Sequence, residues 1–304
     1  MVSREERAWA AGFFDAEGSA SAFAGRHSMR AEVSASQASR TGVPEELRRF
    51  QAALGGLGAI YGPFRGSLYY WKSARYEVVF DTAIELWPWL SQPKRDQMLR
   101  TLENGMGGST RKRRAFDRSP LVEVSHDRRE ELAWAGGFFS GEGSIALFSD
   151  SRTRRDYRYG SLYVTQATAD GTTPVTLLRL SGALFGLGRV RGPFTRHDPW
   201  SKLPQYRWSI RSREGVQAAL AAMWPWLGSR VRRKAEETLR TINGQTRRYA
   251  ERDGRGRWST HADLRAGPAS SNLALSAARR WPSGPAARPG QSSGRSTRPV
   301  GTFG

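Results

Sequence analysis

Two glutamates occupy the same place in two copies of one short segment. Glu17 lies in AWAAGFFDAEGS at 8–19, and Glu142 lies in AWAGGFFSGEGS at 133–144. Nine of these twelve positions are identical. If each segment is helical up to its glutamate, the acid opposes the helix macrodipole, so its recurrence requires a cause other than helix stability. We therefore interpret Glu17 and Glu142 as functional acids.

The chemistry of such a pair is that of a cation site. Two carboxylates held close together repel each other, and their pKa values rise unless a cation neutralises them. Mg²⁺ prefers oxygen ligands, retains waters and binds phosphate groups. Bound there, it would activate water for attack on a phosphodiester and stabilise the leaving oxygen. We expect Glu17 and Glu142 to be catalytic and to bind Mg²⁺, with the backbone carbonyls of Ala16 and Gly141 as further ligands.

Two helices must position these acids, and we expect them over Arg4 to Ala16 and from Ser125 onward. Each has a small residue at every fourth position of one face. A glycine inside a helix costs up to about 1 kcal/mol relative to alanine, so close packing of the two helices must compensate for it. The small residues are Ala8, Gly12, Ala16, Ala133, Gly137 and Gly141. We therefore expect the helices to pack against each other and bring the acids together.

The similarity between the copies continues well beyond these helices. LGGLGAIYGPF at 54–64 is echoed by LFGLGRVRGPF at 184–194, and WPWL occurs at both 87–90 and 224–227. A repeat of this length is a duplicated domain rather than a solenoid unit. Two copies in one chain would pack about a pseudo-two-fold axis, and duplex DNA has a matching approximate symmetry.

Strand patterns follow each helix. SASAFAG with AEVSASQ, and SIALFSD with SLYVTQA, are typical of strand pairs, and a second pair is expected near AIYGPF and SLYYWKSARYEVVF. We predict an α+β fold of two pseudo-symmetric αββαββα repeats, forming a saddle of antiparallel sheets with the two motif helices packed at the centre. Each sheet would leave one polar face open to DNA.

The charge of the chain favours a nucleic-acid partner. Lys and Arg number 48 against 28 Asp and Glu, a formal net charge of +20, and such cations release counterions from a phosphate backbone. An anionic membrane surface is the alternative, but no apolar run has transmembrane length and no signal peptide is visible. The absence of cysteine excludes disulfides and cysteine-bound zinc. We expect a cytoplasmic or nucleoid location, with an organelle remaining open.

The domain boundaries follow from the repeats and from composition. We expect a first repeat at 1–106, a basic flexible linker at 107–124, a second repeat at 125–246 and an Arg, Gly, Pro and Ser-rich disordered tail at 247–304. The linker and tail either add phosphate contacts or are a solvated segment and a dispensable extension.

At these motifs the chain resembles the LAGLIDADG homing endonucleases in their single-chain, two-motif form. The nine-residue motif corresponds to AAGFFDAEG at 10–18 and AGGFFSGEG at 135–143, and the resemblance covers about residues 5–245. It implies a saddle-shaped fold, a monomer and Mg²⁺-dependent cleavage of both strands of a long, roughly pseudo-palindromic DNA site. We expect two or three ions shared between the repeats. Asp15 in the first motif is replaced by Ser140 in the second, which does not affect the metal role.

The resemblance also implies polar and basic side chains around the ions. Gln37 in ASQ and Gln166 in VTQ match one such position, and Lys94 after WPWL matches the lysine of the family. In the second repeat the counterpart of Lys94 is either Arg232 or Lys234. The alternative for all of these is a phosphate contact or a solvated charge.

DNA sequence would be read by the polar strand faces, through contacts with base edges in the major groove. The candidate readers are Arg26, Arg30, Ser34 and Ser36 in the first repeat and Arg158, Ser161, Tyr163, Arg207 and Ser209 in the second.

The sequence thus predicts a site-specific, Mg²⁺-dependent double-strand DNA endonuclease. The alternative is a DNA- or RNA-binding protein on the same scaffold that does not cut, such as an intron maturase or a transcription regulator. Retention of both glutamates favours cleavage, although a maturase can also keep them.

Overall fold

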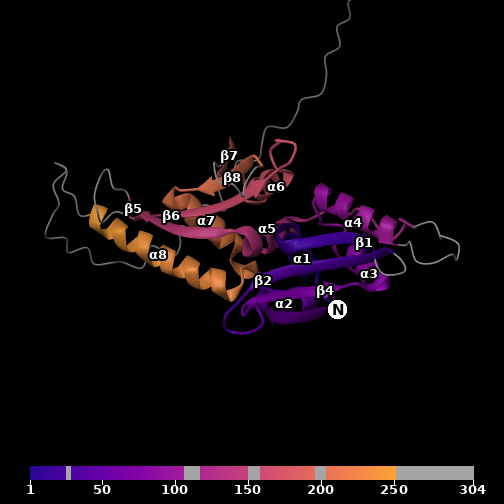
Figure 1. The fold of residues 1–304 in the computed structure, drawn as a ribbon. Coiled ribbons are helices and arrows are strands. Elements are labelled where there is room, and N and C mark those ends of the chain that lie inside the picture. The colour runs from indigo at the N-terminus through magenta and orange to yellow at the C-terminus, as the bar shows by residue number, and fades with distance from the viewer. Residues whose placement is uncertain (25–28, 106–116, 150–157, 196–202, 251–304) are drawn as a thin grey trace, which may run out of the picture. The chain divides into compact units, whose positions relative to one another are not determined.

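The computed structural model describes residues 1–24, 29–105, 117–149, 158–195 and 203–250 (Figure 1). Arg26, most of the 107–124 segment and nearly all of 247–304 lie outside the described residues. Within the described part, no helix has the length and apolar character needed to cross a membrane.

Each repeat begins with a helix and continues with two strand pairs separated by a second helix. The first repeat contains α1 (Arg4–Glu17), β1 (Gly18–Ala24), β2 (Met29–Ala38), α2 (Glu45–Ala53), β3 (Ala59–Phe64), β4 (Leu68–Ser73), α3 (Tyr76–Leu86) and α4 (Gln92–Gly105). The second contains α5 (Arg128–Glu142), β5 (Ser144–Ser149), β6 (Arg158–Ala167), α6 (Val175–Ala183), β7 (Arg189–Phe194), β8 (Gln205–Ile210), α7 (Arg213–Met223), a 3-10 turn (Trp224–Trp226) and α8 (Ser229–Ala250).

The two sheets have the same topology. Each is four-stranded and antiparallel, with strand orders β1-β2-β4-β3 and β5-β6-β8-β7. Both have a register irregularity at the same point of the edge strand, between Tyr61 and Phe64 and between Arg191 and Phe194. The predicted α+β class with two matching antiparallel sheets is confirmed.

One predicted element is wrong in part, since the segment YEVVF was expected to belong to a strand pair. It lies in α3, and each repeat therefore closes with two helices rather than one. Val79, Ala83 and Leu86 are buried at intervals of four and three residues, which is the spacing of one helix face. The β-branched residues at 78 and 79 favour a strand locally, and burial of the helix face outweighs that preference.

Helices α1 and α5 lie side by side, and two glycines make their contact close (Figure 1). A Cβ on Gly12 would lie 2.0 Å from the carbonyl oxygen of Trp134, and a Cβ on Gly137 would lie 2.0 Å from that of Trp9. The same atoms meet in both directions, as a pseudo-two-fold axis requires. The predicted packing of the small-residue faces is confirmed.

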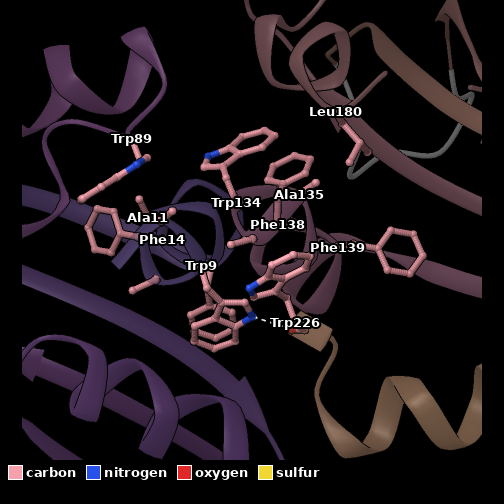
Figure 2. Close-up of a cluster of buried hydrophobic side chains, with 14 of the residues drawn as sticks. Trp9, Ala11, Phe14, Trp89, Trp134, Ala135, Phe138, Phe139, Leu180 and Trp226 are labelled. Atoms are coloured by element: carbon pink, nitrogen blue, oxygen red, sulfur yellow. Dashed lines mark hydrogen bonds between the residues drawn. The ribbon is translucent and has the colours of Figure 1, made fainter. Parts of the chain in front are cut away.

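Large aromatic side chains fill the core on both sides of this helix pair (Figure 2). Trp9 stacks on Phe13 with ring centroids 5.4 Å apart, and Trp134 stacks on Phe138 at 5.1 Å. All four side chains are fully buried. The indole nitrogen of Trp9 also donates to the carbonyl oxygen of Trp226, 2.8 Å away in the other repeat. The core therefore joins the two repeats as well as filling each of them.

Candidate active site

The ends of α1 and α5 converge on the two glutamates. A Cβ on Gly141 would lie 2.5 Å from the Cβ of Ala16 and 2.9 Å from the Cγ of Glu17. Only glycine at this position lets the end of α5 approach Glu17 so closely. Glu142, the next residue, is the last of its helix, as Glu17 is of α1. The structure therefore brings together the two acids that the repeated motif singled out.

The surroundings of these carboxyl groups favour either a proton or a metal cation. Burial, reinforced by the charge of Glu142, raises the pKa of Glu17 to about 7, and the opposing charges of Arg230 and Lys94 are weaker influences. Burial also raises the pKa of Glu142, against the charge of Lys94. A pair of half-buried carboxylates near neutral pH is thus left with incomplete charge compensation.

The donor atoms at this point fit a hard, oxygen-liganded cation such as Mg²⁺. Each helix ends here, so the last backbone carbonyls lack helical partners and are available beside the carboxylates, those of Ala16 and Gly141 among them. In the described residues no group of three or more His, Cys, Asp or Glu side chains is arranged so that it could hold a metal ion. Backbone oxygens, water and phosphate would therefore have to complete the coordination, which is how Mg²⁺ is commonly bound.

Lys94 is also brought to the helix ends. It lies in the first turn of α4, and its Nζ donates to the carbonyl oxygen of Gly18, directly after Glu17. Its ammonium lies 5.6 Å from the centre of the Phe14 ring. Burial lowers the pKa of Lys94, while the charges of Asp15, Glu142 and Glu17 act in the opposite direction. Lys94 therefore lies beside the two acids, and the role that the resemblance implies for it stays a prediction.

Arg232 occupies a different position from Lys94. Its Nε donates to the carbonyl oxygen of Trp224 at 3.1 Å, and its Nη2 to that of Pro225 at 2.9 Å. Arg95 makes the same two contacts in the first repeat, with the corresponding Trp and Pro carbonyls at 3.0 and 2.8 Å. Arg232 is therefore the counterpart of Arg95 and caps the WPW turn.

It follows that the position equivalent to Lys94 is Val231, which is buried. Lys234 lies three residues further along α8 and is exposed. The cation of the second repeat that acts on Glu17 is Arg230, which the sequence analysis did not select. Arg230 was not predicted, because the segments that are identical in the two repeats leave open where the extra residues of the second repeat lie.

The two glutamines lie on or near the helix-covered faces of their sheets. The amide oxygen of Gln166 accepts a hydrogen bond from Thr176 in the first turn of α6. Gln37 is buried, and neither polar atom of its amide has a hydrogen-bond partner in the described part of the chain. Gln166 is thus engaged with a helix, and a role for Gln37 beside the ions stays a prediction.

The open face of the first sheet contains most of the predicted readers of that repeat. Arg30, Ser34 and Ser36 alternate along β2 with buried alanine and valine, so their side chains lie on the face away from the helices. Lys72 pairs with Ser34 across β4, and Glu32 lies on the same face of β2. The last two residues were not predicted, although alternation in AEVSAS and SLYYWKS is the signal that would have found them.

The open face of the second sheet is richer in arginine. Arg207 lies 5.2 Å from the ring centre of Tyr163 and donates to Thr165 at 3.2 Å. Arg189 and Arg191, two exposed residues of β7 that were not predicted, pair with Ser209 and Arg207 across the sheet. The face therefore carries a group of arginine side chains, beside the hydroxyl of Ser209.

Arg158 and Ser161, two of the predicted readers in β6, differ in exposure. Arg158 is exposed at the start of the strand. Ser161 is only 2% exposed, which contradicts its expected role in reading bases. Tyr159 and Tyr163 flank Ser161 on the same strand face.

Two arginines join each repeat to the WPWL segment of the other. Arg49 on α2 pairs with Glu6 at 2.7 Å and donates to the carbonyl oxygen of Trp226 at 3.0 Å. Its guanidinium lies 4.2 Å from the ring centre of Trp9. These contacts hold the turn before α8 against α1.

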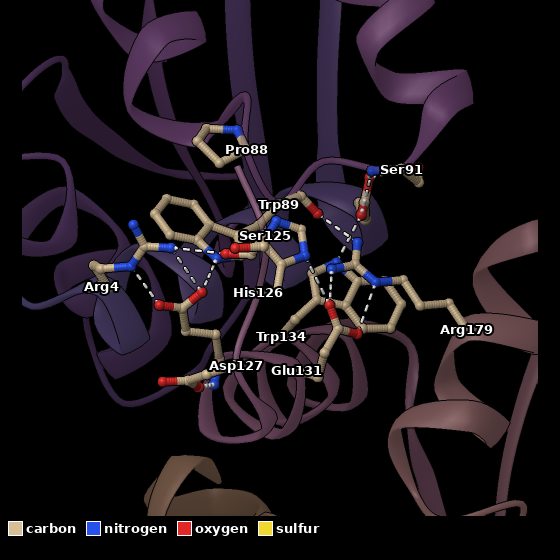
Figure 3. Close-up of polar contacts among 12 residues, drawn as sticks. Arg4, Pro88, Trp89, Ser91, Ser125, His126, Asp127, Glu131, Trp134 and Arg179 are labelled. Carbon is tan, nitrogen blue, oxygen red and sulfur yellow. Dashed lines mark hydrogen bonds and ion pairs between the residues drawn. The ribbon is translucent and has the colours of Figure 1, made fainter. Parts of the chain in front are cut away.

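Arg179 on α6 makes the equivalent contacts in the opposite direction (Figure 3). It pairs with Glu131 at 2.8 Å, donates to the carbonyl oxygen of Trp89 and lies 4.1 Å from the ring centre of Trp134. We refer to Arg49 and Arg179 as the cross-repeat arginines.

Comparison with known proteins gives matches in structure only. No protein-family model matches the chain, and no curated protein matches it in sequence. Among solved structures, the LAGLIDADG meganuclease I-AabMI bound to uncleaved DNA superimposes with a TM-score of 0.55, at 14% identity over 79% of this chain and 92% of its own. The K262A mutant of I-SmaMI has a TM-score of 0.51, at 16% identity over 80% and 93%.

The LAGLIDADG homing endonuclease I-GzeII in complex with its DNA target gives a TM-score of 0.50, at 15% identity over 81% of this chain and 92% of its own. These three structures match the chain over most of its length and of theirs. The chain therefore has the fold of the LAGLIDADG homing endonucleases, and the resemblance carried by its two motifs is confirmed at the level of the fold.

Proposed function

We propose that this chain is a site-specific, Mg²⁺-dependent double-strand DNA endonuclease of the homing type. The observation that carries the proposal is the convergence of Glu17 and Glu142 at the ends of two helices in backbone contact. The similar structures support it, because I-AabMI and I-GzeII are named as nucleases of this class and were solved with DNA.

The partner we propose is a long duplex with rough two-fold symmetry, bound by one monomer. The open faces of the two sheets carry arginine, lysine and hydroxyl side chains that suit phosphates and base edges. Because the sheets share one topology, each would contact one half of the target site. Arg30, Ser34, Ser36, Tyr163, Arg207 and Ser209 remain the proposed readers, and Arg158 a proposed phosphate or base contact.

Glu17 and Glu142 would hold the ions, with the carbonyl oxygens of Ala16 and Gly141, and each carboxylate would serve the cutting of one strand. Mg²⁺ would supply Lewis acidity at the phosphate and lower the pKa of a water. Lys94, close to the helix ends, would stabilise negative charge that develops on the scissile phosphate.

Incubation with Mg²⁺ and supercoiled plasmids that carry a library of candidate sites tests the proposal. The wild-type chain should linearise plasmids that contain its site. Glu17→Gln and Glu142→Gln should abolish cutting while DNA binding persists. Glu77→Gln, at an exposed position on α3, is the matched control and should cut like the wild type.

The alternative function gives a different result in the same experiment. A maturase or transcription regulator would bind specific RNA or DNA and cut no plasmid at any Mg²⁺ concentration. Cutting that survives in both Gln variants would remove Glu17 and Glu142 from the mechanism.

A further inference from the structure

Asp15 has an unusually complete set of hydrogen bonds for a buried acid. It is 4% exposed and lies two residues before Glu17 on α1. Its carboxylate accepts bonds from the backbone nitrogen of Ser91 at 3.0 and 3.2 Å, from the Ser91 hydroxyl at 2.7 Å and from the Trp134 indole at 2.8 Å. These donors come from two other elements, so Asp15 links α1 to both.

Ser91 is the residue from which α4 begins. Its carbonyl oxygen accepts bonds from the backbone nitrogens of Lys94 at 3.0 Å and Arg95 at 2.9 Å. The first turn of α4 is therefore built on Ser91. Because Asp15 bonds both the backbone and the side chain of Ser91, it fixes where this turn lies relative to the end of α1.

A second contact joins the end of α1 to the start of α4, three residues further along the chain on each side. Lys94 donates to the carbonyl oxygen of Gly18, as Ser91 donates to Asp15. The side chain of lysine is long and flexible, so its ammonium is placed well only when the backbone that carries it is held. The two contacts together hold Lys94 next to Glu17.

The second repeat lacks this arrangement. Ser140 replaces Asp15 and bonds the carbonyl oxygen of Gly136 on its own helix at 2.7 Å. The residue equivalent to Ser91 is Gly228, and the residue equivalent to Lys94 is Val231. A serine at this motif position therefore satisfies the fold, so the acid in the first repeat has a purpose that the fold alone does not require.

From these contacts we infer that Asp15 is a positioning residue, which acts through Ser91 to set Lys94 beside Glu17. Burying a carboxylate costs more than burying a hydroxyl, and that cost is accepted only in the repeat that carries the lysine. The effect on cutting rests on the proposed nuclease function, whereas the placement of Lys94 does not.

The placement is tested by NMR on the metal-free chain with lysine labelled at ¹³Cε. The chain has five lysines, and Lys94→Arg identifies the signal of Lys94. In Asp15→Ser, which installs the residue type of the second repeat, this signal should move toward those of the exposed lysines. Asp15→Asn, which keeps the volume and one acceptor oxygen, should move it part of the way. Ser140→Ala, the matched change in the other repeat, should leave it in place.

A Lys94 signal that is the same in Asp15→Ser, Asp15→Asn and wild type overturns the inference. Because no DNA or metal ion is present, this result is independent of whether the chain is a nuclease. A chain that cuts no DNA but shifts its Lys94 signal in Asp15→Ser refutes the proposed function and supports the positioning role.

Cutting provides the second measurement. Asp15→Ser should lower kcat on the order of 10- to 100-fold with little change in KM, because a misplaced group affects the transition state more than DNA binding. Ser140→Ala should change neither. A rise in KM at constant kcat would show that Asp15 serves DNA binding or folding instead.

Discussion

The two repeats agree where they meet and differ where they approach the acids. At the helix pair a Cβ added to Gly12 or to Gly137 would lie 2.0 Å from the equivalent tryptophan carbonyl of the other helix, and the cross-repeat arginines Arg49 and Arg179 make equivalent contacts. At the start of the last helix the first repeat has Lys94 and the second has Val231. The contacts between the repeats are therefore symmetric, whereas the surroundings of the two acids are not.

The largest effect is expected at the symmetric contact between α1 and α5. Gly12→Val and Gly137→Val each place a side chain against a backbone carbonyl of the other helix, so the helices must separate. We expect each to lower the free energy of unfolding by about 3 kcal/mol or more. Urea denaturation measures this, and the two losses should be similar.

The control for these variants is Gly182→Ala on α6, where no atom lies within 4 Å of the added Cβ. That change should be neutral or stabilise by up to about 1 kcal/mol. A loss of less than about 1 kcal/mol in either valine variant would contradict the close helix contact.

A smaller effect is expected at the cations beside the acids, where the two repeats differ. Lys94→Met should slow cutting on the order of 100-fold, because Lys94 acts on both carboxylates. Arg230→Met should have a smaller effect, since Arg230 acts on Glu17. A linear duplex that carries the site, with a different label at the 5′ end of each strand, should then show unequal cutting rates for the two strands. Equal losses in both variants, on both strands, would argue against an asymmetric site.

The smallest effect is expected at the cross-repeat arginines, whose contacts are equivalent in the two repeats. Arg49→Met and Arg179→Met each remove a hydrogen bond to a tryptophan carbonyl of the other repeat and an ion pair within their own repeat, and each should cost about 2 kcal/mol of stability. Only Arg179 also acts on Asp15, so Arg179→Met should additionally lower kcat. Thermal unfolding and plasmid cutting of the two variants provide the comparison. Reduced kcat in Arg49→Met alone would reverse the assignment.

Much of this organisation could be predicted because its signals are local and periodic. Small residues at every fourth position predicted the contact of α1 with α5, and the identity of the two motifs predicted that Glu17 and Glu142 would meet. Alternation along β2 predicted an open polar face with Ser34 and Ser36 on it. Each of these patterns lies within one element.

The equivalent of Lys94 and the role of Asp15 could not be predicted, because both depend on contacts between residues that are distant in the sequence. WPWL recurs after 137 residues and LRT after 140, so the sequence leaves open where three extra residues lie between them. The carbonyl contacts of Arg95 and Arg232 decide this, and they make Val231 the equivalent of Lys94. The role of Asp15 was likewise hidden, because Ser91 is distant in sequence and reaches it only in the folded chain.

Glu17 and Glu142 share one site, so the titration of Glu17 should depend on the charge of Glu142. In the metal-free chain the folded state binds the Glu17 proton more tightly than the unfolded state, so stability is lost as the pH rises through about 7. With glutamate labelled at ¹³Cδ, Glu17 should titrate near pH 7 in the wild type and at a clearly lower pH in Glu142→Gln, where the neighbouring charge is absent. A Glu17 titration that is the same in both proteins would contradict the account.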